Sequence, residues 1–136
     1  MQKEVHLAGI PHHPHKNGGG LVAKTAKVAD TAYVAPHALV SGNAQVLDHA
    51  KILDHAQISG HAQIKENAQV SDHAKVFGHA KVFGHAKISG HAQVYGHAQV
   101  SGYAQVSGYV EVCGSAKISG KFKYQGNMFV SIGEHS

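Results

Sequence analysis

A six-residue pattern repeats along almost the whole chain and leaves few folds open to it. Residues 74–97 read AKVFGH, AKVFGH, AKISGH and AQVYGH, and the same frame runs without insertion from Gly20 to Gly133 as nineteen hexads. A short repeat of fixed length is typical of a solenoid, in which each unit buries its apolar face only by stacking on its neighbours. The sequence therefore predicts a single repeat domain.

Each hexad predicts a short strand followed by a bend. In the unit A-x-V, the alanine and the β-branched residue point to the same side of an extended strand, and the Lys or Gln between them points away. The next positions hold Gly or Asp and then His, Asn or Tyr, and both Gly and Asp accept backbone angles that most residues avoid. A helix is excluded, because the strict alternation and the recurring glycine do not fit a 3.6-residue period.

Three such strands would close a triangular coil of eighteen residues, and coils would stack at the normal strand spacing of about 4.8 Å. We therefore expect an all-β, single-stranded parallel β-helix of about six coils, roughly 30 Å tall. Its interior ladder is expected to consist of Val28, Val34, Val40, Val46, Ile52, Ile58, Ile64, Val70, Val76, Val82, Ile88, Val94, Val100, Val106, Val112 and Ile118.

The repeat frame also predicts the organisation of the chain. The expected parts are an N-terminal arm (1–19), the regular β-helix (20–121), and a last coil with a C-terminal cap (122–136). In the cap, the larger Phe122, Tyr124 and Met128 would plug an end whose unpaired backbone groups could otherwise accept another strand. The glycines and prolines of the arm predict a flexible segment that could cover the first coil.

The chain resembles the hexapeptide-repeat, left-handed parallel β-helix superfamily over about 114 of its 136 residues. The matching signature is an aliphatic residue with a small residue four positions later, as in Val76 and Ala80. The left hand is implied by this resemblance alone, since the usual crossover rule for parallel strands gives the opposite hand. Within the superfamily, the chain is most similar to low-complexity bacterial repeat proteins that are catalogued only as candidate transferases.

Composition limits the partners and the compartment. No apolar run approaches the 18 residues of a membrane span, and the first twenty residues lack a signal-peptide pattern. We therefore expect a cytoplasmic protein or part of a larger, surface or secreted polypeptide. The single cysteine, Cys113, excludes an internal disulfide framework and a multi-cysteine zinc site. The net charge is +4, but all twelve basic residues are evenly spread lysines, which argues against nucleic-acid binding.

Nine of the fourteen histidines occupy the last position of a hexad. With eighteen residues per coil, outward-facing imidazoles would form columns along the three edges of the prism, about 5 Å apart. The first column is His37, His55, His73 and His91, followed by Tyr109. The second is His49, Asn67, His85 and Tyr103, and the third is Asn43, His61, His79 and His97.

Two groups of histidines are candidate metal sites. They are the first column (His37, His55, His73 and His91) and the cluster of the arm (His12, His13 and His15). The alternative is that the position merely needs a polar residue that suits a corner, because Asn, Tyr and Ser also occupy it, and no carboxylate is assigned to orient each ring. No cofactor is expected. Stacked imidazoles should repel one another when protonated, so stability should weaken below about pH 6.

Three aromatic residues are candidates for a binding face. Phe77 is expected to stack under Tyr95 on one face, and Phe83 lies on another. Exposed aromatic neighbours can mark a sugar or subunit contact, although sheets also tolerate aromatic residues at their surface. The expected partners are further copies of the chain, as a homotrimer or end to end, or a polysaccharide.

These observations favour a non-enzymatic, rigid module that serves as a structural, surface, assembly or binding element. The frame has no inserted loop, and a regular prism offers few concave pockets. The resemblance implies the alternative of a trimeric acyltransferase, with a catalytic histidine and active sites between prisms, but the loops that shape its acyl-donor pocket are missing here. A weaker alternative is binding of ice or polysaccharide. No catalytic residue is assigned.

Overall fold

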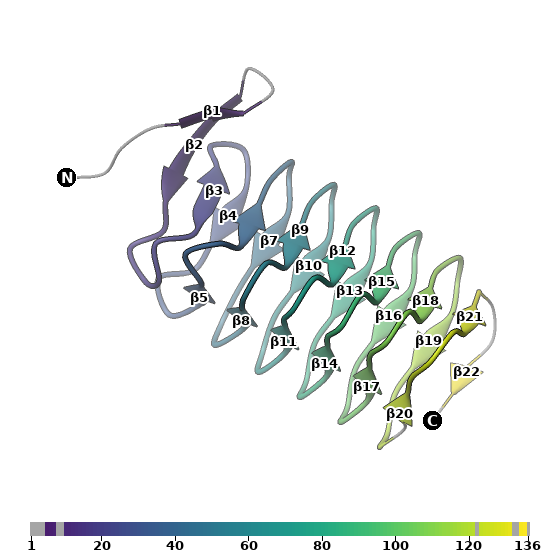
Figure 1. Cartoon of the computed structure of the whole chain (residues 1–136). Coiled ribbons are helices and arrows are strands. Elements are labelled where there is room, and N and C mark those ends of the chain that lie inside the picture. Colours follow the sequence, from purple (N-terminus) through teal and green to yellow (C-terminus); the bar gives the residue numbers. More distant parts are fainter. Residues whose placement is uncertain (1–4, 8–9, 122, 132–133, 136) are drawn as a thin grey trace.

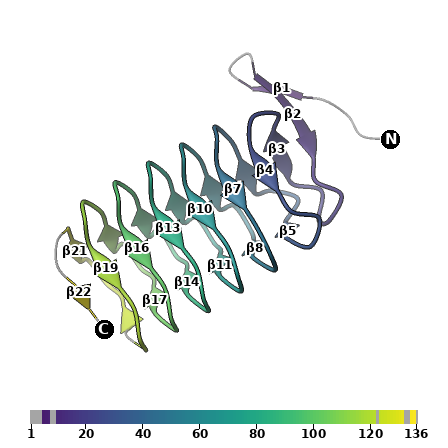
Figure 2. The same cartoon turned by 180° about the vertical axis from the view of Figure 1, so that it is seen from behind.

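The computed structural model of the chain describes residues 5–7, 10–121, 123–131 and 134–135, with side chains for 11–121 and 123–131. Within these residues the chain is all-β, with short strands, tight turns and no helix (Figures 1 and 2). The strands stack into three sheets, and the chain winds as a β-solenoid of about six coils. The fold class predicted from the hexads is therefore confirmed. None of the described residues forms a helix that could cross a lipid bilayer.

The three sheets are named A, B and C in the order in which the chain visits them. Sheet A contains β1 (Val5–Leu7), β2 (Ile10–Pro14), β3 (Leu21–Ala23), β6 (Leu39–Val40), β9 (Gln57–Ile58), β12 (Lys75–Val76), β15 (Gln93–Val94), β18 (Glu111–Val112) and β21 (Phe129–Val130). Sheet B contains β4 (Lys27–Val28), β7 (Gln45–Val46), β10 (Gln63–Ile64), β13 (Lys81–Val82), β16 (Gln99–Val100), β19 (Lys117–Ile118) and β22 (Glu134–His135). Sheet C contains β5 (Tyr33–Val34), β8 (Lys51–Ile52), β11 (Gln69–Val70), β14 (Lys87–Ile88), β17 (Gln105–Val106) and β20 (Lys123–Tyr124).

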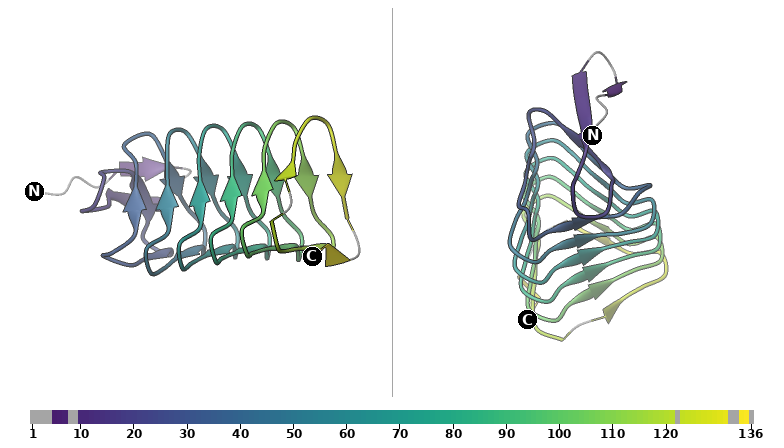
Figure 3. Two further views of the ribbon diagram at one scale, coloured as in Figure 1. Left: turned by 90° about the horizontal axis from the view of Figure 1, so that it is seen from below. Right: turned by 90° about the vertical axis from the view of Figure 1, so that its left-hand side faces the viewer.

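Strands of the solenoid pair in parallel with partners eighteen residues away. Gln63 of β10, for example, lies between Gln45 of β7 and Lys81 of β13. Seen from its end, the stack of coils has a three-sided outline (Figure 3). In Figure 1 the chain rises along sheet A on the near side and descends along sheet B on the far side as it advances toward the C-terminus, which is a left-handed turn. The corners are named AB, BC and CA after the sheets that they join.

The interior is a ladder of alanine and β-branched side chains. From Ala32 to Ile118, the residues at the first and third hexad positions are at most 3% exposed. Burying a Val or Ile side chain contributes roughly 1.5–3 kcal/mol, so the ladder is the main source of stability. Val28, in the first rung of sheet B, is only half-buried, whereas the rest of the predicted ladder is confirmed.

From Gly42 to Gly126, the fifth hexad position at each corner has backbone in the left-handed region. Gly60 has a φ of +64°, and a Cβ placed there would lie 2.8 Å from the backbone nitrogen of Gly78 in the next coil. Four other corners use an acidic residue at a similar φ: Asp48, Asp54, Glu66 and Asp72. The preference of the hexad for Gly or Asp therefore has the predicted conformational cause.

The N-terminal segment covers two edges of the first coil (Figure 1). Strand β2 pairs antiparallel with β3, with His12 opposite Ala23. The carbonyl of Asn17 accepts a hydrogen bond from the N–H of Val34 (3.1 Å), and the N–H of Gly20 donates to the Val34 carbonyl (3.0 Å). Sheets A and C are thus covered at this end, while β4 is the outermost described strand of sheet B.

At the other end, the residues expected to plug the last coil differ in burial. Tyr124 is 8% exposed and fills the core position, as does Val130 at 7%. Met128, by contrast, is 43% exposed and its neighbour Phe129 is 65% exposed, so neither side chain fills the coil. Phe122 lies outside the described residues.

Candidate functional site

The three predicted side-chain columns are present at the corners. On corner CA, His37, His55, His73, His91 and Tyr109 form one continuous stack with ring centroids 5.1–5.2 Å apart. On corner AB, His61, His79 and His97 stack at 5.0 Å. On corner BC, His85 stacks on Tyr103 at 4.9 Å. Each ring occupies the last hexad position and is exposed. From His49 onward, that position follows a residue in the left-handed region.

The geometry of the CA column bears directly on its candidate metal site. The rings of His55, His73 and His91 are nearly parallel, with interplanar angles of 5°. Equivalent nitrogens of parallel rings are separated by about the stacking distance, which exceeds the roughly 4.2 Å that two Zn–N bonds can span. Among the described side chains, no group of three or more His, Cys, Asp or Glu could hold a metal ion. A metal on this column stays a prediction and would require the rings to rotate.

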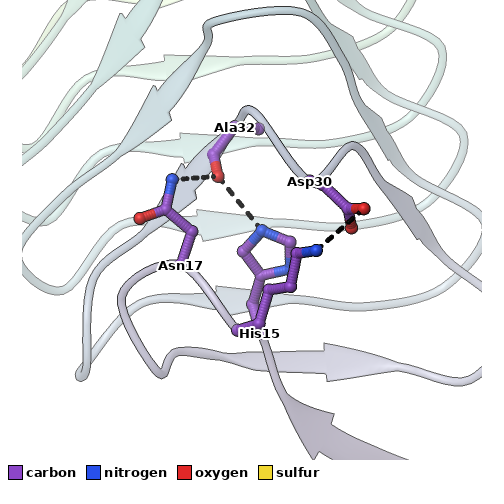
Figure 4. Close-up of polar contacts among 5 residues, drawn as sticks. His15, Asn17, Asp30 and Ala32 are labelled. Carbon is purple, nitrogen blue, oxygen red and sulfur yellow. Dashed lines mark hydrogen bonds and ion pairs between the residues drawn. The ribbon is translucent and has the colours of Figure 1, made fainter.

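The three histidines of the arm have different surroundings in the structure, and their role as a metal site stays a prediction. His12 and His13 are successive residues of β2, so their side chains point to opposite faces, and His12 is only 3% exposed. His15 is 7% exposed, and its Nε2 donates a hydrogen bond to the carbonyl of Ala32 (3.0 Å). The Asn17 amide donates to the same carbonyl at 3.0 Å (Figure 4). His15 therefore anchors the covering segment to the first coil.

An ion pair adds to this anchor. Lys16 Nζ lies 3.0 Å from Asp30 Oδ2, and both side chains are mostly exposed. Exposed pairs of this kind contribute little, so the buried hydrogen bond of His15 is the stronger attachment.

The carboxylates at the corners accept hydrogen bonds from backbone N–H groups of the next coil. The N–H groups of Glu66 and Asp72 donate to Asp48 and Asp54 at 3.1 Å, and those of Gly84 and Gly90 donate to Glu66 and Asp72 at 2.9 Å. Sequence reasoning assigned these residues only a conformational role. Their second role is to accept a hydrogen bond from the next coil. The sequence signal for it is an acid at the fifth hexad position and, eighteen residues later at the same corner, a residue whose backbone N–H can donate to that acid.

The predicted aromatic stack of Phe77 and Tyr95 is present, with centroids 4.9 Å apart and planes 4° apart. The Tyr95 hydroxyl donates a hydrogen bond to Glu111 Oε1 (2.8 Å). This bond raises the pKa of Tyr95 well above its ordinary value, and the neighbouring Cys113 thiol and burial act in the same direction. Phe83 lies on corner BC, with Lys65 Nζ 5.3 Å from its ring centre, so it does not join the Phe77 pair. The proposed role of the three as a binding face stays a prediction.

An open groove runs along sheet C beside corner BC. Its floor is the outward row of sheet C, and its rim is the column of corner BC. The floor consists of Tyr33, Lys51, Gln69, Lys87, Gln105 and Lys123, which lie in register in neighbouring strands. The rim consists of His49, Asn67, His85, Tyr103 and Lys121.

Three hollows of ≈ 380, 560 and 450 Å³ follow one another along this groove. The first two share His49, Lys51 and Gln69, and the second ends at Lys87, one rung before Gln105 of the third. Sequence reasoning did not single the groove out. Its signal in the sequence is lysine at every thirty-sixth residue of one face, at Lys51, Lys87 and Lys123.

Comparison with known proteins supports the fold. The YdcK beta solenoid repeat family matches residues 92–108, which contain β15, β16 and β17, one strand of each sheet. No curated protein and no solved structure matches the chain significantly. The matched repeat, the stacked parallel sheets and the eighteen-residue register agree with one another. The chain is therefore a β-solenoid repeat protein.

Proposed function

We propose that the chain is a non-enzymatic, rigid module that acts as a structural or binding element through its long flat faces. One observation carries this proposal. From β3 to β20 each hexad adds one strand and one corner, and no described segment of that part leaves the coil. An enzyme site needs a pocket that encloses its substrate. The hollows here are open and lined mainly by Lys, Gln, His and Asn.

The internal contacts support rigidity. Each coil is joined to the next by backbone hydrogen bonds at all three sheets and at the corners, as between the N–H of His79 and the carbonyl of Gly96 (2.7 Å). The buried ladder continues through every coil from Ala32 to Ile118 without a break. A body of this kind keeps side chains at fixed spacings over its whole length, which suits a spacer, a surface element or a platform for an extended ligand.

The competing function is acyl transfer at a site between subunits, which the resemblance to hexapeptide-repeat proteins suggests. Isothermal calorimetry with acetyl-CoA, up to millimolar concentrations, tests it together with release of free CoA in the presence of an amine. We expect neither binding heat nor CoA release. Light scattering on the same sample measures the oligomeric state. A lack of acetyl-CoA binding argues against a site between subunits only if the subunits are associated in that sample.

Asparagine variants of the corner histidines provide a matched control for that test. Asn43 and Asn67 already occupy the same hexad position, so His73→Asn and His85→Asn should preserve the fold. CoA release by the unaltered protein that disappears in either variant would overturn the proposal of a non-enzymatic module.

A further inference from the structure

We propose that the groove along sheet C binds a linear anionic polysaccharide in an extended conformation, with carboxylate or sulfate groups on alternate sugars paired with Lys87 and Lys123 and, further along, with Lys51. This inference rests on the proposed function as a binding module and names its ligand. Three properties of the groove support the inference: the spacing of its lysines, its straightness and its charge.

The spacing of the lysines on the floor is regular. Lys51, Gln69, Lys87, Gln105 and Lys123 lie on five successive strands in register. Lysines therefore recur at every second strand, about 9.6 Å apart at the normal strand spacing. This distance is close to the length of a disaccharide in an extended, 1,4-linked polysaccharide, in which substituents of alternate sugars face the same side.

The groove is also unusually straight. Neighbouring strands in most sheets are rotated by roughly 20–25° relative to one another. Here the rings of His85 and Tyr103 on the rim differ by only 3° in orientation, and those of corner CA by 5° along most of the column. Successive coils are thus stacked almost without rotation, and a straight polysaccharide ribbon can stay in contact with the floor over several disaccharides.

The charge of the groove favours an anion, most strongly in its C-terminal half. None of Lys51, Lys87 and Lys123 forms an ion pair with another residue of the described part of the chain, and all three are exposed. The fifth hexad position on corner BC is acidic at Asp48 and Glu66 but glycine at 84, 102 and 120. Beside Lys87 and Lys123 the rim therefore carries no acid, and Lys121 adds a further positive charge.

Neutral groups between the lysines suit sugar hydroxyls. Gln69 and Gln105 offer an amide donor and acceptor at the rungs without lysine, and His85 and Asn67 offer further polar atoms on the rim. The Tyr103 ring lies beside Gln105 and Lys123 in the third hollow. His85 stacks on one face of this ring and Lys121 Nζ lies 5.9 Å from its centre on the other side, so the ring offers a sugar its edge and hydroxyl group and not a face.

Other polyanions fit the spacing less well. Phosphates of each strand of a DNA duplex recur at about 3.4 Å along the axis. Side chains on one face of an extended acidic peptide recur at about 6.6–6.8 Å. Three phosphate steps come to about 10.2 Å, but the DNA strand winds by roughly a third of a turn over that length, so its phosphates do not stay on one face. The peptide spacing differs from that of lysines two strands apart, and the chain contains no arginine for bidentate phosphate contacts.

The test uses two hexasaccharides that differ only in charge: β-1,4-linked oligoglucuronate and cellohexaose. Binding to the full chain is measured by calorimetry at low ionic strength and again in 0.5 M salt. We expect the oligoglucuronate to bind, the neutral cellohexaose to bind at least about tenfold more weakly, and salt to weaken the charged ligand. A sulfated hexasaccharide with β-1,3 linkages would not match the repeat, whereas a β-1,4-linked sulfated hexasaccharide should bind as the carboxylate does.

Three variants locate the site. The triple substitution K51Q/K87Q/K123Q removes the floor lysines, and we expect it to lower affinity about tenfold or more. Its matched control is K27Q/K81Q/K117Q, which removes three lysines from the same hexad position of sheet B and should change affinity less than about twofold. Among single substitutions, Lys87→Gln should cost more than Lys51→Gln.

A charge-conserving variant tests the spacing itself. K87Q/Q105K keeps the net charge of the chain but moves one lysine by a single strand, next to Lys123. We expect weaker binding of the oligoglucuronate, although the total charge is unchanged. Circular dichroism and thermal melting of each variant show whether the solenoid is intact.

Several results would overturn the inference. These are equal loss of affinity in the sheet C and sheet B triple variants, undiminished binding by K87Q/Q105K, or equally tight binding of oligoglutamate or oligothymidylate. A complete lack of oligoglucuronate binding would also overturn it, while the proposal of a non-enzymatic module would stand. That broader proposal fails only if acyl transfer is found.

Discussion

Residues 44–73 and residues 74–127 build the same corners in two different ways. In the first stretch, four of the five corner positions with positive φ are acidic and one is glycine; in the second stretch, all of them are glycine. The φ angles are nevertheless alike, at 58° for Asp72 and 64° for Gly90. The requirement of the fold is thus the left-handed backbone, and the identity of the residue decides how that requirement is met.

The acidic corners offset their backbone strain with a hydrogen bond. Left-handed backbone costs a non-glycine residue roughly 1–2 kcal/mol. The Asp72 carboxylate accepts a hydrogen bond from the N–H of Gly90 (2.9 Å), and a bond to a charged group contributes about the same amount. Glycine avoids the strain, but the N–H of Gly108 above Gly90 then has no acceptor among the described residues. The two stretches therefore reach similar stability by different routes.

The largest effect is expected from Gly90→Ala. The new Cβ would lie 2.7 Å from the nitrogen of Gly108 in the next coil, and alanine would also be held at a φ of +64°. Together these should lower the free energy of unfolding by about 2–4 kcal/mol, which urea denaturation followed by circular dichroism can measure.

The comparison predicts that Gly90→Asp lowers the free energy of unfolding less than Gly90→Ala does. The carboxylate introduced by this substitution could accept a hydrogen bond from the N–H of Gly108, as Asp72 does from Gly90. We expect the loss of stability to be about half that of Gly90→Ala. If the aspartate variant proves as unstable as the alanine variant, the hydrogen bond does not offset the strain, and the account of the acidic corners is wrong.

An intermediate effect is expected from Asp72→Ala. This variant keeps the strained backbone but removes the acceptor of the Gly90 N–H, so it should lose about 1–2 kcal/mol. Asp72→Gly removes the same acceptor and also the strain, and should lose less than about 1 kcal/mol. The same urea experiment ranks the two, and a glycine variant less stable than the alanine variant would contradict the comparison.

The smallest effect concerns single amides in the unaltered protein. The N–H groups of Gly84 and Gly90 are hydrogen-bonded to carboxylates, whereas those of Gly102 and Gly108 have no acceptor among the described residues. Hydrogen exchange followed by NMR should be slower for the first pair, on the order of tenfold. Equal exchange at all four glycines would show that the carboxylates do not hold the next coil.

Most of the fold follows from the repeat. The alternation of Ala, Lys or Gln, and Val fixes which side chains face inward, and the constant length of the hexad fixes which residues share an edge. For this reason the column from His37 to Tyr109 and the stack of Phe77 on Tyr95 could be predicted without coordinates. Regularity makes each local inference apply to the whole chain.

The parts that could not be predicted are those where the repeat is absent or where two repeats cooperate. The segment before Gly20 has no periodicity to show that β2 runs antiparallel on β3, or that His15 is buried against Ala32. Met128 keeps the frame, yet its side chain is 43% exposed. The groove combines floor residues with rim residues two positions earlier, and a reading of single columns does not reveal it.

The eighteen-residue register also restricts how a chain of this kind can change in length. Removal of one hexad between Gln69 and Lys87 would turn all later residues by one third of a revolution relative to the earlier ones, so that Lys87 would no longer lie beside Gln69. Only the gain or loss of three hexads together restores every side chain to its own face. Growth by whole coils would lengthen the solenoid and keep every side chain on its face, whereas any smaller change would move the later side chains to other faces.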